Sequence, residues 1–193
     1  MKNYVILGAG GHAKSLVEAI TAKGGEISAY VDPRRCEWLE CRHEKDEMAI
    51  TPEDGSIIVG LGGICPDKLI YRLSILEQML ARDFDAPPII HPQAQVSVNA
   101  SLEPGVIIMR GAIIQPGASL GLGCIVNTGA IVEHDSNIGA GAHIAPGAII
   151  LGSCNIGKTS FIGAGAVVLQ GQEVKKGSLI PALMKFSGKK NQS

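Results

Sequence analysis

The sequence predicts a small α/β unit over residues 1–86, a parallel β-helix over residues 87–182, and a tail over residues 183–193. Two observations support this fold class. Aliphatic residues recur at every sixth position from Ile90 to Ile180, and strand-like and helix-like stretches alternate before that repeat. A period of six fits neither an α-helix nor an open strand, and it is typical of a β-helix in which each hexad forms a short strand and a turn.

The repeat is unbroken over sixteen hexads. Its aliphatic positions are Ile90, Val96, Leu102, Ile108, Ile114, Leu120, Val126, Val132, Ile138, Ile144, Ile150, Ile156, Ile162, Val168, Val174 and Ile180. Four positions later the residue is mostly small, as at Ala112, and the residue before that is often glycine, as at Gly111, which suits a tight turn. Three hexads per coil would stack residues 18 apart at the usual strand spacing. We therefore expect a three-sided prism of five coils with an aliphatic interior.

Composition and charge exclude several classes of protein. The 193 residues carry 17 basic and 18 acidic side chains, and a net charge of −1 favours neither nucleic acid nor an anionic membrane as a partner. No apolar run approaches the length of a membrane span, and the strand-like start at Tyr4 leaves no room for a signal peptide. The five cysteines are odd in number, which favours a reduced, cytoplasmic protein.

The first unit alternates strands and helices. We expect strands at 3–7, 27–31, 57–59 and 86–90, helices at 14–23 and 67–82, and a loop or short helix over 34–55. The second helix should turn inward Leu69, Ile70, Leu73, Leu76 and Leu80. This alternation predicts a Rossmann-like parallel unit, about half the size of a full dinucleotide fold.

A glycine-rich turn follows the first strand. Gly8-x-Gly10-x-x-Ala13 matches a dinucleotide fingerprint, and Asp32 lies near the position of the ribose-binding acid. Glycines let a phosphate approach backbone N–H groups at a helix N-terminus, so the motif fits any nucleotide. A tight turn without a ligand is the alternative. His12 at the helix start is expected to point toward the ligand crevice.

These features together resemble one family. The turn containing Gly10, Gly11 and His12, then Asp32, the Gly60 turn and a hexapeptide prism carrying Glu133-His134-Asp135 resemble the sialic acid O-acetyltransferases and nucleotide-sugar (UDP-4-amino-sugar) N-acetyltransferases of bacterial glycan synthesis. The resemblance covers nearly the whole chain. It implies a left-handed β-helix, a homotrimer, acetyl-CoA in the grooves between prisms, and a nucleotide-sugar substrate contacted by the residues at positions 10–12, 32 and 60.

The sequence departs from that family in three places. Pro33 stands where some relatives have a second acid, residues 34–55 are not matched in detail, and Leu179–Lys185 is only loosely similar to the usual small-Pro-Ala-Lys ending. The last departure leaves open how the tail contacts CoA.

On the prism, His134 follows inward Val132 by two residues, so its ring should face outward at a turn. Acetyl transfer needs a base that titrates near neutral pH, which imidazole supplies. Asp135 matches the family position that assists the histidine, and Glu133 is the other candidate. Gly152 lies one coil further at the same corner, where its backbone N–H could stabilise an oxyanion.

His143 precedes inward Ile144 and should also point outward. It matches a family position that contacts acetyl-CoA, and with Ala164 it would line the groove for the pantetheine arm. We expect no metal site. His91 is better explained as a cap, and His43 with Cys36 and Cys41 fits no zinc spacing.

Three functions remain open from the sequence. The acceptor is an amino group on a nucleotide-linked sugar, or a sialic acid hydroxyl, or the chain is a non-catalytic, nucleotide-binding trimeric scaffold. A trimer is expected because the outer faces of the prism bear the isoleucines Ile107, Ile113, Ile125, Ile131 and Ile149, which would form an exposed apolar stripe on a monomer.

Overall fold

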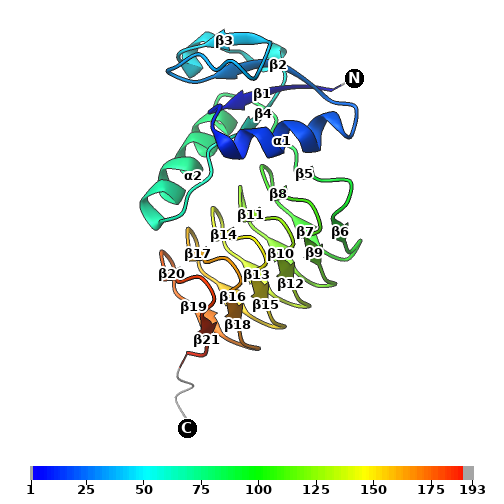
Figure 1. Ribbon diagram of the computed structural model, residues 1–193, viewed down its shortest axis with the longest axis vertical. Helices are drawn as coiled ribbons and strands as arrows, with labels where there is room; N and C mark the ends of the chain where they lie inside the picture. The colour runs from blue at the N-terminus through cyan, green and yellow to red at the C-terminus, as the bar shows by residue number, and fades with distance from the viewer. Residues whose placement is uncertain (1, 189–193) are drawn as a thin grey trace.

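The computed structural model describes residues 2–188 and shows an α/β unit seated on a β-solenoid (Figure 1). The unit contains β1 (Asn3–Leu7), α1 (Gly11–Thr21), β2 (Glu26–Val31), β3 (Arg42–Glu44), the 3-10 turns η1 (Glu47–Ala49) and η2 (Pro52–Asp54), β4 (Ser56–Val59) and α2 (Pro66–Leu80). All of its strand pairs are parallel, and the order is β3-β2-β1-β4.

The solenoid consists of two-residue strands. They are β5 (Ile89–Ile90), β6 (Gln95–Val96), β7 (Ser101–Leu102), β8 (Ile107–Ile108), β9 (Ile113–Ile114), β10 (Ser119–Leu120), β11 (Ile125–Val126), β12 (Ile131–Val132), β13 (Asn137–Ile138), β14 (His143–Ile144), β15 (Ile149–Ile150), β16 (Asn155–Ile156), β17 (Phe161–Ile162), β18 (Val167–Val168), β19 (Glu173–Val174), β20 (Leu179–Ile180) and β21 (Lys185–Phe186). Strands 18 residues apart pair in parallel, as the repeat predicts.

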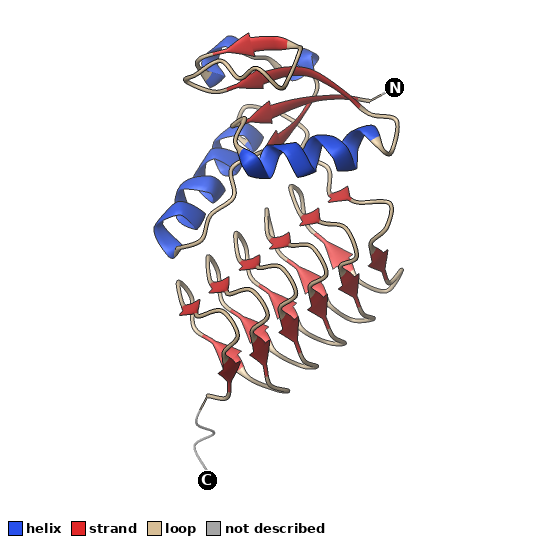
Figure 2. Cartoon of the chain, in the orientation of Figure 1, coloured by secondary structure: helices blue, strands red, loops and turns tan. Residues whose placement is uncertain are grey.

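These strands form the three faces of a prism. The first face contains β5, β8, β11, β14, β17 and β20, the second contains β6, β9, β12, β15, β18 and β21, and the third contains β7, β10, β13, β16 and β19. Figure 2 shows the short strands stacked from coil to coil. The solenoid extends one hexad past the expected end at residue 182, because Phe186 of β21 packs against the core.

The predicted aliphatic positions fill the prism. They are buried from Ile108 to Ile180, and only those of the first coil, such as Ile90, are half-buried. The predicted turn glycines all have φ between 60° and 75°; they are Gly105, Gly111, Gly117, Gly123, Gly129, Gly141, Gly147, Gly165, Gly171 and Gly177. Non-glycine residues take the same turn at Asp135, Ser153, Thr159 and Leu183. Positive φ is strained for such residues and is common near functional sites.

The α/β unit has three layers. α1 packs on the sheet face that carries Ile6 and Tyr30, and it contacts the first prism face at Ile107 and Ile125. α2 packs on the opposite sheet face, against Val5 and other residues. One side of this helix also contacts the turns of the prism. The expectation that Ile107 and Ile125 lie on open faces was therefore wrong, because the α/β unit covers them.

Several predicted elements need correction. The 34–55 segment contains β3, which pairs with β2 although its three polar residues give no strand signal. α1 begins at Gly11, ahead of the expected start at Lys14. Ile70 of α2 is 53% exposed and does not face the core. The expected strand over 86–90 shortens to β5.

Within residues 2–188 no helix is long and apolar enough to cross a membrane. The five cysteines are free thiols. In the same described range, no group of three or more His, Cys, Asp or Glu side chains is arranged to hold a metal ion.

Candidate functional site

His134 lies at the turn between β12 and β13, on the edge shared by the second and third prism faces. Its Nδ1 is 2.9 Å from Oδ2 of Asp135, and the two side chains are 52% and 68% exposed. A carboxylate can only accept, so Nδ1 carries the hydrogen and Nε2 has a free lone pair. The side chain of Glu133 has no hydrogen-bond partner among the described residues, so Asp135 is the carboxylate that contacts the ring.

Gly152 lies directly beside this ring. A Cβ atom built on Gly152 would be 2.5 Å from Nε2 of His134, so no other residue fits without moving the imidazole. The backbone N–H of Gly152 has no hydrogen-bond partner among the described residues, whereas Ser153 N–H donates to the His134 carbonyl. This corner therefore combines an imidazole with a free ring nitrogen, a carboxylate bonded to that ring, and a backbone N–H without a partner in the described chain.

A second group of predicted residues lies at the carboxyl edge of the sheet. Asp32 links two loops there, because its Oδ2 accepts from Ala9 N–H and its Oδ1 from Arg34 N–H, each at 3.0 Å. A Cβ at Gly60 would collide with the Gly8 carbonyl, which shows how closely the loops after β4 and β1 approach. The carboxyl ends of parallel strands form the usual ligand crevice of such sheets.

Gly10 and Gly11 open this crevice. A Cβ atom at either position would meet nothing within 4 Å, so the space above them is unoccupied by protein. The backbone at the start of α1 can therefore be approached closely by a ligand, as a phosphate requires.

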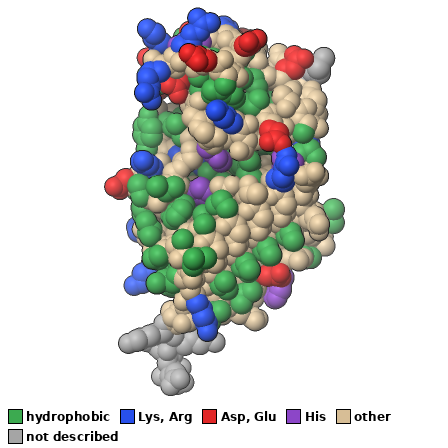
Figure 3. Space-filling model, viewed as in Figure 1, with side chains coloured by type: hydrophobic (Ala, Val, Ile, Leu, Met, Phe, Trp, Pro, Cys, Tyr) green, Lys and Arg blue, Asp and Glu red, His purple; other side chains and the backbone are tan. Residues whose placement is uncertain are grey.

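His12 and His143 lie where the α/β unit meets the first prism face. Burial, the positive charge of Arg72 and the proximity of His143 lower the pKa of His12 to about 3. Burial lowers the pKa of His143 to about 4, although its bond to the Gly63 carbonyl opposes the shift. Both imidazoles are neutral near pH 7. Figure 3 shows histidine side chains at this junction.

His143 does not line an open groove, contrary to the sequence prediction. It is only 5% exposed, because the Gly63 loop covers it. Its Nδ1 lies 2.7 Å from the Gly63 carbonyl, and its Nε2 lies 3.0 Å from Nδ2 of Asn127. The carbonyl can only accept, so Nδ1–H donates and Nε2 accepts from the Asn127 amide. His12 differs, because its buried Nε2 has no partner among the described residues.

The predicted site residues therefore occupy different parts of one chain. His134, Asp135 and Gly152 share the edge between the second and third faces, and His12 and His143 lie at the first face. Ala164 is exposed on the turn that connects the first face to the second.

Sequence reasoning missed Arg72, which is fully buried on α2. Its guanidinium donates to the Leu61 carbonyl and to the Gly123 carbonyl, and so ties the crevice loop to the prism. The available signal was a charged residue on the apolar stripe of the helix, three positions after Leu69. His91, predicted to be a cap, accepts from Gln93 N–H through Nδ1. His43 stacks on Tyr30, and its Nε2 lies 2.8 Å from the Asp32 carbonyl oxygen.

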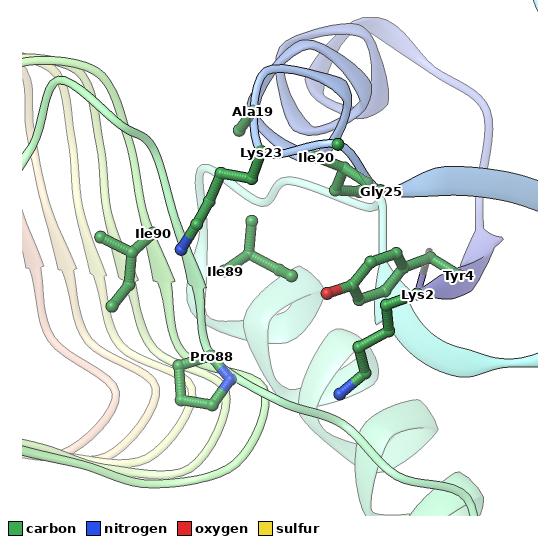
Figure 4. Close-up of a pocket in the computed structure, with 10 residues that line it drawn as sticks. Lys2, Tyr4, Ala19, Ile20, Lys23, Gly25, Pro88, Ile89 and Ile90 are labelled. Carbon is green, nitrogen blue, oxygen red and sulfur yellow. The ribbon is translucent and has the colours of Figure 1, made fainter.

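A small cavity of about 150 Å³ opens at the opposite edge of the sheet, between α1, the start of β1 and β5 (Figure 4). Its floor is apolar, with Ile20 and Ile89, and Lys2 and Lys23 lie around it. It contains none of the predicted site residues, so we place no chemistry there.

Comparison with known proteins is consistent with this arrangement. Residues 3–65 match the family model of the PglD N-terminal domain. The acetyltransferase domain of PglB from Neisseria gonorrhoeae is similar, with 35% identity, a TM-score of 0.87, and coverage of 94% of this chain and 89% of that one. A structure of that domain with acetyl coenzyme A shows 34% identity, a TM-score of 0.84 and 93% coverage of both chains.

PerB from Caulobacter crescentus, in complex with CoA and GDP-perosamine, is 29% identical with a TM-score of 0.85, over 94% of this chain and 87% of that one. No curated protein sequence matches this chain.

Proposed function

Because the chain belongs to the acetyltransferase family that includes the PglB acetyltransferase domain, we propose that it acetylates the amino group of a nucleotide-linked amino sugar in bacterial surface-glycan synthesis. It is an acetyltransferase whose acetyl donor is acetyl-CoA. The observation that supports this most directly is the His134 corner, where an imidazole bonded to a carboxylate lies beside Gly152, whose backbone N–H has no partner among the described residues.

In the proposed reaction, the amine of the sugar attacks the thioester carbonyl of acetyl-CoA. Nε2 of His134 accepts the proton that the nitrogen loses, and Asp135 holds the ring through Nδ1–H and stabilises the imidazolium that forms. The backbone N–H of Gly152 donates to the oxyanion of the tetrahedral intermediate. Collapse of that intermediate expels CoA thiolate, which takes up the proton, and leaves the amide.

We place the acceptor in the crevice at the carboxyl edge of the sheet. The open space over Gly10 and Gly11 admits a diphosphate, and Asp32 is near enough to accept from ribose hydroxyls with its remaining lone pairs. The α/β unit has only four strands, so it supplies one mononucleotide half and favours a nucleotide-sugar over NAD. The five free cysteines fit a reducing compartment, so we place the reaction in the cytoplasm.

In this proposal a second copy of the chain completes the site. The second prism face carries a half-buried column of Ile113, Ile131, Ile149 and Val167, which another copy would cover. His134 lies on one edge of that face and Ala164 on the other. We propose a homotrimer in which His134 of one copy meets the crevice and Ala164 of its neighbour, with acetyl-CoA in the groove between them.

The assembly can be measured by light scattering. The trimer should have three times the mass of the 20.1-kDa chain. Replacing Ile131 by Asp should yield monomers, whereas Asn137→Asp on the polar third face should remain trimeric. A wild-type chain that is monomeric at micromolar concentration would overturn the proposed assembly.

The activity can be tested by following release of CoA thiol from acetyl-CoA. A panel should contain nucleotide-linked amino sugars, the matching nucleotide-sugars with a hydroxyl in place of the amine, and free sialic acid. We expect turnover only with an amino sugar, and its loss in the His134→Ala variant. Turnover with sialic acid alone would instead favour the O-acetyltransferase alternative, and no turnover with any acceptor would favour a non-catalytic scaffold.

A further inference from the structure

We infer that the nucleotide recognised by this protein carries guanine, and that Glu47 and Lys45 select it. This inference rests on the proposed function, because it assumes that a nucleotide-sugar occupies the crevice. The argument starts from the two clefts that open on either side of Asp32.

The first cleft suits a diphosphate. It has a volume of about 460 Å³, and its charged residues include Lys14, Arg34 and Arg35, with Asp32 at its margin. Lys and Arg side chains also gather over the α/β unit in Figure 3. Three cations against one carboxylate favour a polyanionic group, and Gly10 and Gly11 leave room for it.

The second cleft suits a nucleobase. It has a volume of about 290 Å³, and its walls are largely apolar, formed by Pro33, Leu61, Tyr71 and Ile75. Tyr71 is 62% exposed, so an unusual amount of aromatic surface is left open here. A flat aromatic base can stack on such a ring and bury it. Because Asp32 borders both clefts, a ribose held there would direct its diphosphate into one cleft and its base into the other.

Among residues 2–188, two charged side chains other than Asp32 line the second cleft, Lys45 and Glu47. Neither side chain has a hydrogen-bond or salt-bridge partner within residues 2–188. The backbone that carries Glu47 is nonetheless fixed. The Asp46 carboxylate caps the turn η1 by accepting from Met48 N–H at 2.8 Å, and the Glu47 carbonyl accepts from Arg82 at 2.8 Å.

This pair of charges matches guanine better than the other bases. The edge of guanine presents two adjacent N–H donors, on N1 and the 2-amino group, which one carboxylate can accept together, and an O6 acceptor for an ammonium group. Uracil and thymine present a single N–H donor flanked by two carbonyls. Cytosine and adenine present an amino group beside an acceptor nitrogen, which a carboxylate would repel.

The test is a nucleotide titration of the full-length protein, read from the fluorescence of Trp38. Trp38 is the one tryptophan of the chain and lines the neighbouring diphosphate cleft, so it should respond to any bound nucleoside diphosphate. The probes are GDP, inosine diphosphate, which lacks the 2-amino group, UDP, dTDP and CDP. We expect GDP to bind roughly 10- to 100-fold more tightly than UDP, dTDP or CDP, with inosine diphosphate in between.

The Glu47→Gln variant should lose most of that preference, because the amide offers one acceptor in place of two, and Lys45→Met should lose less. The control is Glu26→Gln, the same substitution at the amino end of β2, which should bind like the wild type. Tighter binding of UDP or dTDP than of GDP, or an unchanged preference in Glu47→Gln, would overturn the guanine assignment while leaving the proposed function intact. Failure to bind any of the five nucleotides would count against the proposed function itself.

Discussion

The histidines of this protein occupy two contrasting settings. His134 is half-exposed on a prism edge, paired with an exposed carboxylate, and free at Nε2. His12 and His143 lie at the junction of the α/β unit and the prism, where burial near Arg72 keeps both uncharged. A histidine that exchanges protons with a substrate must stay accessible, whereas a buried neutral histidine serves through its fixed hydrogen bonds. We therefore assign proton transfer to His134 and a positioning role to His12 and His143.

The largest effect is expected at the exposed histidine. His134→Ala should lower turnover by roughly 10²–10⁴-fold, because it removes the general base. The free energy of unfolding should change little, since the side chain contacts mainly solvent and Asp135. Steady-state kinetics and chemical denaturation of the same preparation test both statements. Turnover close to that of the wild type would place the base elsewhere.

A smaller loss is expected from Gly152→Ala. The added methyl group would occupy space now taken by the His134 ring, and would shift both the base and the oxyanion donor. Turnover should fall by roughly 10²-fold. If Gly152→Ala keeps full turnover, the backbone N–H at this corner is not the oxyanion donor.

Asp135→Asn should cost less, roughly tenfold in turnover, because it weakens ring orientation without removing the base. Asparagine tolerates the φ of 58° at this turn, so the backbone should be retained. Glu133→Gln is the matched control and should behave like the wild type, since the bond to the ring in the described chain comes from Asp135 and not from Glu133. Equal losses of turnover in the two variants would contradict the assignment of Asp135 as the residue that orients the His134 ring.

The two buried histidines should make the free energy of unfolding depend on pH. Their folded pKa values, about 3 for His12 and about 4 for His143, lie below the ordinary value near 6.5. At pH values between the folded and the ordinary pKa, these histidines bind a proton in the unfolded chain but not in the folded chain. The contribution of these two histidines to the free energy of unfolding is therefore complete above about pH 6.5, and it is lost as the pH decreases toward their folded pKa values.

At pH 4.5 the loss should be roughly 2 kcal/mol for each histidine, measured by denaturation at pH 7 and pH 4.5. His143→Gln should show less acid sensitivity than the wild type, although it is less stable at pH 7. His134→Gln changes an exposed ring and should keep the wild-type sensitivity. A His143→Gln variant with unchanged acid sensitivity would contradict the buried, neutral state of that ring.

The sequence predicted the prism well because its period is local: each hexad determines its own strand, inward residue and turn. The His134 corner was predictable for the same reason, since residues 18 apart must stack. His143 was misplaced because its burial depends on Gly63, eighty residues earlier in the chain. β3 was missed because parallel pairing with β2, and not its own polar residues, makes it a strand.

The central claim is that the active site is completed between copies of the chain, with the base on one copy and the nucleotide crevice on the next. It can be tested by mixing two inactive variants. His134→Ala lacks the base but keeps the crevice. Gly11→Val keeps the base but blocks the crevice, and the open space around Gly11 should let the variant fold.

The two variants should be unfolded and refolded together in equal amounts, and CoA release compared with that of each variant alone. Random mixing pairs an intact crevice with an intact His134 at about one interface in four in a cyclic trimer, so turnover should recover to about a quarter of the wild-type value. No recovery, with trimers shown to contain both variants, would mean that each site lies within one chain and would contradict the account.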